Sequence, residues 1–499
     1  MFASSLSAVA QGNRVYDFCL IGAGPAGITL ALKLASRGFS VLLLEAGAMN
    51  YSVESQALYE GDIFGKEPYS LSLSRLRYFG GTSGHWGGWC RYLEDYDFRD
   101  KVPGIDSAWP IQRSDLDPYA KATAEILELG EFAPDTKLDD DVNYIQYQYS
   151  TPVKFGLKYR SALEQADNIT VVLEAPLTNI IESGGTIVAI EARGRDQRSH
   201  RLSARRYVLC AGGVENSRLL LWANAQNGQR IVKEPKTLGR YWMEHPTYTV
   251  GEALLSTDSV PWTFDKKNTA YISPSAAAIA KHKIMNCALR LHQTHYEGTK
   301  AIVASLACVA PDTATWASQQ VHFNLVCGIQ IRANWEQSPQ PFNRVTLSDK
   351  RDALGIPRTD LHWEYTEVER HTILVSMKLF GEYLLKTQTG RVRLMPWLAQ
   401  DRPFPVDDEV RGNHHMGGTR MSVDPRRGIV DPDGKIHGLE NFYVCGSSVF
   451  PSSGQANPTY TIIQLACRLA DHLSKTVVNP ARQAVTAQAQ TAGREPASN

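Results

Sequence analysis

The chain has 499 residues, more than a single hydrophobic core usually organises, so its length predicts two or more domains. Hydrophobic residues make up 43% of the sequence and charged residues 21%, the balance of a globular protein. Lysine plus arginine and aspartate plus glutamate both number 52, so the basic excess typical of nucleic-acid-binding proteins is missing. No window approaches about 18 consecutive apolar residues, and residues 1–15 lack the features of a secretory signal. We therefore expect a cytoplasmic protein that neither spans a membrane nor binds nucleic acid.

The eight cysteines predict no metal site, because the sequence contains no Cys-x-x-Cys pair. Cys19, Cys210 and Cys445 each lie in an apolar run, where a buried thiol behaves as a small hydrophobic group. The absence of Cys-x-x-Cys-His also predicts that this chain carries no c-type haem.

The N-terminal region predicts a strand, a helix and a second strand. Residues 16–21 form an apolar run, residues 26–37 have helical spacing up to Gly38, and residues 41–44 form another apolar run before Glu45. The turn between the first strand and the helix reads Gly22-Ala23-Gly24-Pro25-Ala26-Gly27. In this context Gly-x-Gly-x-x-Gly indicates a dinucleotide-binding site.

Each glycine of this fingerprint has a physical role. Gly22 permits a tight turn, Gly24 lets the backbone approach a pyrophosphate, and Gly27 lets the helix pack closely on the strand. The helix N-terminus favours the phosphate charge, and Glu45 can accept hydrogen bonds from a ribose diol. The fingerprint does not distinguish FAD from NAD. The glycine-rich stretch 80–90, with one histidine and two tryptophans, suits close backbone approach to a flat ring system.

The rest of the chain predicts further strands and helices around a region of antiparallel sheet. We expect strands at 169–173, 206–210 and 441–445, and helices at 214–224, 366–386 and 458–474. Apolar and polar residues alternate in parts of 250–365, for example at 321–331 and 343–347, which predicts an antiparallel sheet. Residues 478–499 have no apolar periodicity and are predicted to be a disordered tail.

These motifs, in this order and spacing, resemble those of the glucose-methanol-choline (GMC) oxidoreductases over most of residues 14–476. The motifs that carry the resemblance are the fingerprint at 22–27, the loop 80–88, Ala211-Gly212-Gly213 with Glu215-Asn216-Ser217, Gly239-Arg240-Tyr241 with Met243-Glu244-His245-Pro246, Glu336-Gln337 through Asn343-Arg344-Val345-Thr346-Leu347, His415 with Gly418-Thr419, and Asn457-Pro458-Thr459. Their spellings are most similar to those of the bacterial sugar-oxidising branch and the pyranose oxidases. The resemblance implies a tightly bound FAD and the two-electron oxidation of an alcohol.

The resemblance also implies which residues contact FAD. They are Gly22, Gly24, Ala26, Gly27, Glu45, Ala46, Gly81, Thr82, His85, Trp86, Gly87, Ala211, Gly212, Gly446, Ser447, Pro458 and Thr459. His85 matches the histidine that pyranose oxidases attach covalently to the flavin methyl group, but Gly84 replaces the threonine before it. Covalent attachment through His85 and simple packing of His85 against the dimethylbenzene edge both stay open. Gly446-Ser447-Ser448 is a further departure, because many family members have an aspartate there.

Alcohol oxidation by a flavin requires a base for the hydroxyl proton and a polar group that points the C–H bond at flavin N5. His415 and Asn457 match the family's pair for these two tasks, and histidine titrates near neutral pH. Neighbouring side chains of an extended segment point opposite ways, so only one of His414 and His415 can face the flavin. The spacing to Gly418-Thr419 favours His415, and His414 is the alternative base.

The residue Asn457 also fits a second role, because asparagine before Pro458 is a preferred helix N-cap. The positive end of the following helix could then stabilise negative charge at the flavin N1–C2=O edge. Candidate substrate contacts are Gln330, Asn334 and His414, with Arg332 on the same predicted strand. Such polar residues suit a polyol or sugar ring, although strand alternation could place them in solvent instead.

We predict an α/β protein with a Rossmann-like FAD-binding domain at 11–48, 166–250 and 407–477. The second, α+β, domain is a substrate domain built on an antiparallel sheet, from 49–165 and 251–406, together with cofactor-covering loops. The predicted reaction is oxidation of a secondary hydroxyl of a sugar, glycoside or similar polyol. Oxidation of an aryl, amphenicol-type or natural-product alcohol, and a redox-silent lyase reaction, are the alternatives. The electron acceptor is O2 or another acceptor, which includes a separate electron-transfer subunit.

Overall fold

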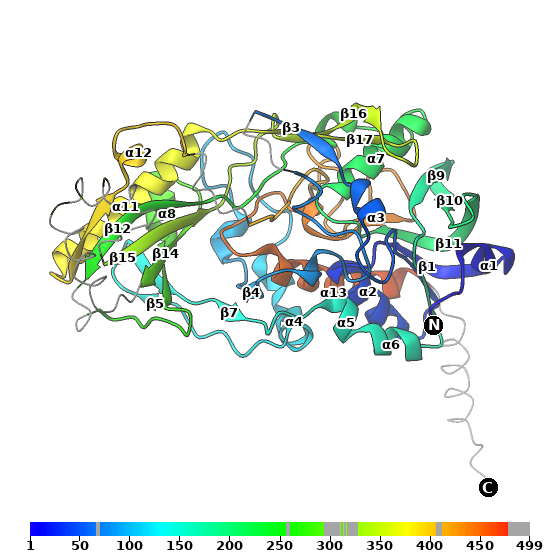
Figure 1. Ribbon diagram of the computed structural model, residues 1–499, viewed down its shortest axis with the longest axis horizontal. Coiled ribbons are helices and arrows are strands. Elements are labelled where there is room, and N and C mark those ends of the chain that lie inside the picture. The colour runs from blue at the N-terminus through cyan, green and yellow to red at the C-terminus, as the bar shows by residue number, and fades with distance from the viewer. Residues whose placement is uncertain are drawn as a thin grey trace, which may run out of the picture.

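The computed structural model describes residues 1–65, 70–255, 260–293, 328–405 and 412–477, together with residues 310, 313 and 316. The predicted tail at 478–499 and residues 321–327 of a predicted strand lie outside the described residues. Figure 1 shows an elongated molecule with an antiparallel sheet under helix α11 at one end and a parallel sheet beside helices α2 and α13 at the other.

The first large sheet has seven strands, and its core is parallel. Its order is β8-β2-β1-β11-β10-β9, and β19 pairs with β11. The strands are β1 (Val15–Ile21), β2 (Val41–Leu44), β8 (Ile169–Val172), β9 (Leu177–Ser183), β10 (Thr186–Arg193), β11 (Ser199–Leu209) and β19 (Phe442–Val444). The pairs β8–β2, β2–β1, β1–β11 and β11–β19 are parallel, and β9 and β10 form an antiparallel extension. The carboxyl ends of five parallel strands therefore meet at one edge.

Helices α2 (Pro25–Ala35) and α13 (Pro458–Thr476) pack against each other beside this sheet. Helix α13 is amphipathic and buries one face, which includes Ile463, whereas α2 is buried on most sides, as Ile28, Leu30 and Leu34 show. The other helices of this part are α1 (Leu6–Gln11), α3 (Val53–Ala57), α4 (Ala120–Leu127), α5 (Phe155–Lys158), α6 (Arg160–Gln165) and α7 (Glu215–Gln226).

The second large sheet also has seven strands, in the order β18-β12-β15-β14-β13-β6-β5. The strands are β5 (Thr136–Lys137), β6 (Val142–Ile145), β12 (Thr247–Leu255), β13 (Thr269–Pro274), β14 (Cys287–Gln293), β15 (Ile329–Trp335) and β18 (Gly390–Leu394). All their pairings are antiparallel. Helix α11 (Glu367–Lys386) packs on one face, and α8 (Ala276–His282) and α12 (Pro396–Ala399) lie nearby. In β15 burial alternates, so its polar side chains share the opposite face.

Two smaller sheets complete the fold. One consists of β16 (Arg344–Arg351), β17 (Pro357–Trp363) and β3 (Gly61–Gly65), and the other pairs β4 (Trp89–Cys90) with β7 (Gln148–Tyr149). The strand predicted at 343–347 is β16, so it lies in this separate sheet and not in the large antiparallel one. Sequence periodicity could not show this, because the partner β3 comes from a distant segment.

The predicted fold class, with a Rossmann-like part and an antiparallel part, is confirmed. The proposed domain boundaries stay a proposal. The cysteines within the described residues are all buried, as predicted for Cys19, Cys210 and Cys445. Over the described part of the chain, no helix combines the length and apolar character needed to cross a bilayer.

Candidate functional site

A cavity of about 590 Å³ opens at the carboxyl edge of the parallel sheet and extends to the antiparallel sheet. The residues that follow β1, β2, β11 and β19 line it, together with the N-termini of α2 and α13 and the loop 81–89. In open α/β sheets, ligands bind outside the carboxyl ends of the strands. The far wall of the cavity comes from β14 and β15.

The cavity brings together most of the residues predicted from the sequence. Those that line it are Gly22, Gly24, Ala26, Glu45, Ala46, Gly81, Thr82, His85, Trp86, Gly87, Ala211, Gly212, Asn334, His414, His415, Gly446, Ser447, Asn457, Pro458 and Thr459. Two predicted residues do not line it. Gly27 lies behind the cavity wall, and Gln330 lies on β15 beyond the part that reaches the cavity.

The three fingerprint glycines have different surroundings. Gly22 has φ +110°, and a Cβ there would lie 2.6 Å from the carbonyl oxygen of Cys210. A Cβ on Gly27 would lie 1.9 Å from the carbonyl oxygen of Gly22, so this glycine allows the helix to contact the turn. A Cβ on Gly24 would meet no atom within 4 Å. The backbone at Gly24 thus borders open space at a helix N-terminus, which fits the pyrophosphate of a dinucleotide.

The carboxylate of Glu45 is buried at the end of β2 and faces the cavity. It accepts hydrogen bonds from the backbone N–H groups of Ala23 (2.9 Å) and Gly47 (2.8 Å). Burial raises the pKa of Glu45, while these hydrogen bonds and Arg77 oppose the rise. Its remaining lone pairs can accept hydrogen bonds from a ribose diol.

A buried cluster of charged residues near the cofactor end was missed by the sequence analysis. Arg75 pairs with Glu215 at 3.3 Å, and Arg218 binds Glu215 at 2.8 Å and Asp352 at 2.5 Å. Arg75, Arg77, Glu215 and Arg218 all line the cavity. Glu215 belongs to a motif quoted for the resemblance, but no pattern in the sequence links it to Arg75.

Hydrogen bonds fix the protonation of His414. Nε2 of His245 lies 2.7 Å from the carbonyl oxygen of Gly454, which can only accept, so Nε2 carries the hydrogen. Nδ1 of neutral His245 is then an acceptor, and it lies 3.1 Å from Nδ1 of His414. His414 therefore donates through Nδ1 and keeps a lone pair on Nε2. Burial lowers the pKa of His245 to about 4 and that of His414 well below its ordinary value, so both rings are neutral at neutral pH.

The neighbouring His415 is more deeply buried. Its ring packs against Trp242 at a centroid distance of 5.8 Å, and Nε2 lies 3.9 Å from Oε2 of Glu244. Nε2 is inaccessible and has no hydrogen-bond partner among the described residues. Burial, with a smaller contribution from Arg75, lowers the pKa of His415 to about 3. Both histidines line the cavity, but their ring environments differ.

The side chain of Asn457 does not cap helix α13. Asn457 occupies the N-cap position, yet its side chain makes no capping hydrogen bond and Nδ2 donates to the carbonyl oxygen of Trp89 at 3.0 Å. The predicted N-cap position of Asn457 before Pro458 is therefore confirmed, although its side chain binds Trp89 and not the helix. Pro458 and Thr459 line the cavity, so the N-terminus of α13, which has no side-chain cap, borders it.

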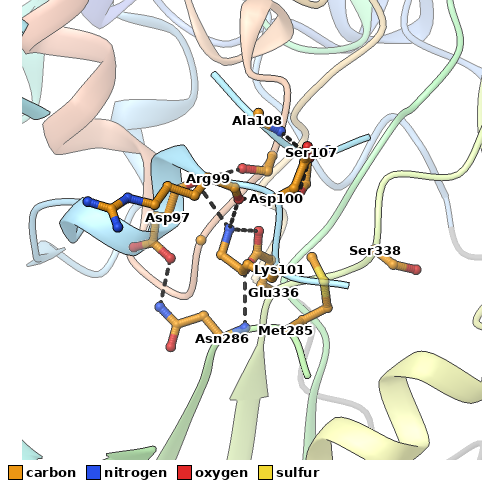
Figure 2. A network of polar contacts seen from close by, with 12 residues as sticks. Asp97, Arg99, Asp100, Lys101, Ser107, Ala108, Met285, Asn286, Glu336 and Ser338 are labelled. Atoms are coloured by element: carbon orange, nitrogen blue, oxygen red, sulfur yellow. Dashed lines mark hydrogen bonds and ion pairs between the residues drawn. The ribbon is translucent and has the colours of Figure 1, made fainter. Parts of the chain in front are cut away.

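A buried polar network supports the loop 452–457, as Figure 2 shows in part. Nζ of Lys101 lies 3.2 Å from Oε1 of Glu336 and 3.1 Å from the carbonyl oxygen of Asp97, while Nδ2 of Asn286 donates to Oδ1 of Asp97 at 2.9 Å. Ser452 donates to that same Asp97 carbonyl at 3.1 Å. The network thus fixes the start of the loop that carries Gly454 and Asn457.

His85 lines the cavity and is exposed. Partial burial lowers its pKa. Trp86, beside it, donates through Nε1 to the carbonyl oxygen of Val153 at 3.0 Å.

Known proteins share both sequence and fold with this chain. The family model described as GMC oxidoreductase matches residues 339–466, which include His414, His415 and Asn457. The chain is 23% identical to the fructose dehydrogenase large subunit of Gluconobacter japonicus over 548 positions, covering 91% of this chain and 97% of that protein. It is also 23% identical to 2-methyl-1,2-propanediol dehydrogenase of Mycolicibacterium austroafricanum, covering 92% and 95% respectively.

Among solved structures, pyridoxine 4-oxidase from Mesorbium loti matches with a TM-score of 0.56 and 16% sequence identity. The match covers 92% of this chain and 99% of that one, and it shows a shared fold. The family, enzyme class and cofactor predicted from the sequence are confirmed, whereas the branch within the family stays a prediction. Residues 339–466 match the GMC oxidoreductase family, most of the chain is similar to the dehydrogenases named above, and the protein is an FAD-dependent oxidoreductase.

Proposed function

We propose that this enzyme oxidises a secondary hydroxyl of a sugar, glycoside or similar polyol to a carbonyl. One observation carries the proposal: a neutral histidine with a fixed lone pair and a polar asparagine line the same cavity as the dinucleotide cradle. FAD, when bound there, accepts the hydride that leaves the alcohol carbon. The chain itself must then hold the hydroxyl group and take its proton.

The geometry favours His414 as the base. A general base needs an unprotonated nitrogen that the substrate can reach and a partner that orients the ring. His414 has both, because Nδ1 is bound to His245 and Nε2 keeps its lone pair. Nε2 of His415 faces Glu244 instead. The sequence spacing favoured His415 as the base, but this residue could accept the proton only through Nδ1. Its burial beside His414 also suits a role in shaping the site.

Asn457 is proposed to hold the alcohol oxygen. Its Nδ2 already donates to the Trp89 carbonyl, so the side chain has a fixed direction and its remaining donor and acceptor can serve the substrate. Asn334, on β15, adds a second polar group at the cavity wall. Two oriented amides are the kind of group that positions a polyhydroxylated substrate for reaction.

The name of the first relative, a fructose dehydrogenase, supports a sugar, and the name of the second supports a non-sugar diol as the runner-up substrate class. A redox-silent lyase is the least supported alternative. The name "large subunit" also supports the proposal that a separate subunit, rather than O2, takes the electrons. Hydrogen peroxide release in air would indicate that O2 is the acceptor.

An anaerobic absorbance titration tests the reaction. Sugars, glycosides, aryl alcohols and aliphatic diols are added to the yellow protein, and bleaching near 450 nm by one class names the substrate. If dithionite bleaches the flavin and no alcohol does, the proposed oxidation of an alcohol is wrong. The protein is then precipitated with acid. Yellow colour in the pellet would indicate covalent attachment through His85, and yellow colour in the supernatant would indicate non-covalent FAD.

Two matched variants test the base. His414→Ala should keep FAD bound and lower the rate of flavin reduction by roughly 10²–10⁴-fold, the usual contribution of general base catalysis. His415→Ala should lower it far less if His415 only shapes the site. A larger loss of flavin reduction rate in His415→Ala than in His414→Ala would indicate that His415 is the base.

A further inference from the structure

Two arginines face the cavity side by side on the antiparallel sheet. Arg290 of β14 and Arg332 of β15 are direct partners in the strand register, and both line the cavity. Like charges directly opposite each other on two strands are destabilising. Such a pair needs either a counter-ion or a ligand that brings one.

The described part of the chain provides no counter-ion for this pair. Neither arginine forms an ion pair with a described carboxylate, and Nε of each is buried without a hydrogen-bond partner among the described residues. The acids lining the cavity are Glu45, held by backbone N–H groups, and Glu215, held by Arg75 and Arg218. Both belong to the cofactor end.

One acid outside the cavity lining, Asp265, interacts with His292 beside the pair and is already engaged. Asp265 accepts hydrogen bonds from the hydroxyl groups of Tyr149 (2.8 Å) and Thr269 (2.7 Å). It also accepts hydrogen bonds from the backbone N–H groups of residues 267 and 269. Burial and both arginines lower the pKa of the nearby His292, which favours its neutral form, and a histidine cannot serve as a counter-ion to arginine.

The aromatic neighbours hold one guanidinium in place. Cζ of Arg290 lies 4.1 Å from the ring centre of Trp89, and Tyr271, the partner of Arg290 on β13, also lines the cavity. A guanidinium stacked on an aromatic ring keeps its N–H edge available for a planar or tetrahedral anion. Arg290 is therefore pre-oriented, which lowers the entropic cost of binding.

We propose that Arg290 and Arg332 bind an anionic oxygen group of the substrate, so that the preferred substrate is an acidic polyol or sugar. A carboxylate, as in an aldonate or uronate, and a phosphate ester share this chemistry. The inference rests on the proposed alcohol oxidation and adds a charge requirement to it. The anion anchors one end of the substrate on β14 and β15, while the hydroxyl group to be oxidised lies toward His414 and Asn457.

The test compares matched substrates by anaerobic stopped-flow reduction of the flavin in the intact holoenzyme. Each neutral sugar is paired with its aldonate, its uronate and its phosphate ester. The acidic member should show kcat/KM at least about 10-fold above that of the neutral sugar, in line with a charge-assisted hydrogen bond. The carboxylate and phosphate arms show which anion is preferred. Equal kcat/KM for neutral and acidic members would overturn the inference while leaving alcohol oxidation intact, whereas failure of every alcohol would overturn the proposed function itself.

Variants of the pair sharpen the test. Arg332→Gln and Arg290→Gln should each lower the ratio of kcat/KM for the acidic substrate to kcat/KM for the neutral sugar about 10- to 100-fold. Arg332→Lys should retain part of the preference, because the charge stays and the planar fork is lost. The control is Arg393→Gln on β18 of the same sheet, where Arg393 pairs with Glu252 away from the cavity. It should leave the preference unchanged, and an equal loss for both substrates in either glutamine variant would contradict anion binding.

A second readout does not depend on turnover of an acidic substrate. Inorganic phosphate and malonate should inhibit oxidation of the neutral sugar by the wild type competitively. Arg332→Gln should be inhibited at least about 10-fold less tightly. Absence of inhibition by both anions, together with equal kcat/KM, would exclude an anion site at this wall.

Discussion

Gly24 is the fingerprint glycine at which the need for glycine can be assigned most directly to either the fold or the ligand. Its φ of −87° is ordinary for any residue, and a Cβ there would touch no protein atom within 4 Å. The fold itself therefore does not require glycine at this position. What requires it is the ligand, because a side chain would enter the space beside the helix N-terminus where the pyrophosphate fits.

This separates cofactor binding from folding. Gly24→Val should give a folded protein without FAD, with far-ultraviolet circular dichroism like that of the wild-type apoprotein and no absorbance near 450 nm. Gly27→Val should fail to fold, because its Cβ would lie 1.9 Å from a backbone oxygen. Gly130→Val serves as the control, since a Cβ there meets only a side-chain oxygen at 3.7 Å. A fully flavinylated Gly24→Val protein would contradict the assignment.

The lowered pKa values of the two histidines predict how kcat/KM changes at acidic pH. The base works when neutral, and burial lowers the pKa of His414 well below its usual range and that of His415 to about 3. A lowered pKa keeps the base neutral at more acidic pH. We therefore expect kcat/KM for a non-ionising sugar to stay constant from about pH 8 down to about pH 6, and to fall only at a pH well below the ordinary histidine pKa of about 6.5. An acid limb centred above that value, at constant flavin content, would contradict a buried neutral base.

At the scale of elements, the loop 452–457 depends on charges buried below it. Burial raises the pKa values of Asp97 and Glu336, and Lys101 opposes both shifts. The ammonium group therefore matters most when the two carboxyl groups are ionised. Removing one partner of a buried ion pair usually costs about 3–5 kcal/mol, because the remaining charge is uncompensated.

Lys101→Met should therefore destabilise the protein in a pH-dependent way. In the folded variant both carboxyl groups stay protonated to higher pH, whereas in the unfolded chain they ionise near their ordinary pKa of about 4. The folded state then loses stability as pH rises, so the drop in Tm relative to wild type should be larger at pH 8 than at pH 5.5. Lys137→Met, which removes an exposed pair with Asp140, should leave Tm unchanged at both pH values. A deficit that shrinks as pH rises would contradict this account.

The elements also show what sequence reasoning could and could not supply. Apolar runs and helical periodicity predicted β2 at 41–44, α11 at 366–386 and α13 at 458–474 to within a few residues, because burial of one face dictates the pattern. The sequence did not reveal the contact between His245 and His414, which are 169 residues apart, or the pairing of Arg290 with Arg332. Such contacts depend on strand register and loop paths, which leave no local signal. The hydrogen bond from the Asn457 side chain to the carbonyl oxygen of Trp89 had no local signal for the same reason.

At the scale of the whole molecule, the cavity joins the two large sheets. Residues following the parallel strands line one side and residues of β14 and β15 line the other. A ligand filling this space contacts both parts and binds only the assembled protein. Its binding free energy therefore adds to the stability of the whole fold.

Removal of FAD should lower Tm by an amount that depends on the free FAD concentration. Saturation at about 1,000 times Kd would add about 4 kcal/mol to the folded state. Scanning calorimetry of the apoprotein during titration with FAD should show a single transition that moves to higher temperature, with Gly24→Val as the variant that does not respond. A Tm independent of FAD would place the cofactor outside this cavity.

The arginine pair has a kinetic consequence in a chain whose positive and negative charges both number 52. The molecule has no net charge with which to draw an anion from bulk solution, so the attraction is confined to a Debye length, about 8 Å at physiological ionic strength. Added salt should therefore change how long an acidic substrate stays bound far more than how often it arrives. If the pair binds such a substrate, selectivity for acidic molecules should come from residence time, and encounter rates measured at low and high salt should be nearly the same.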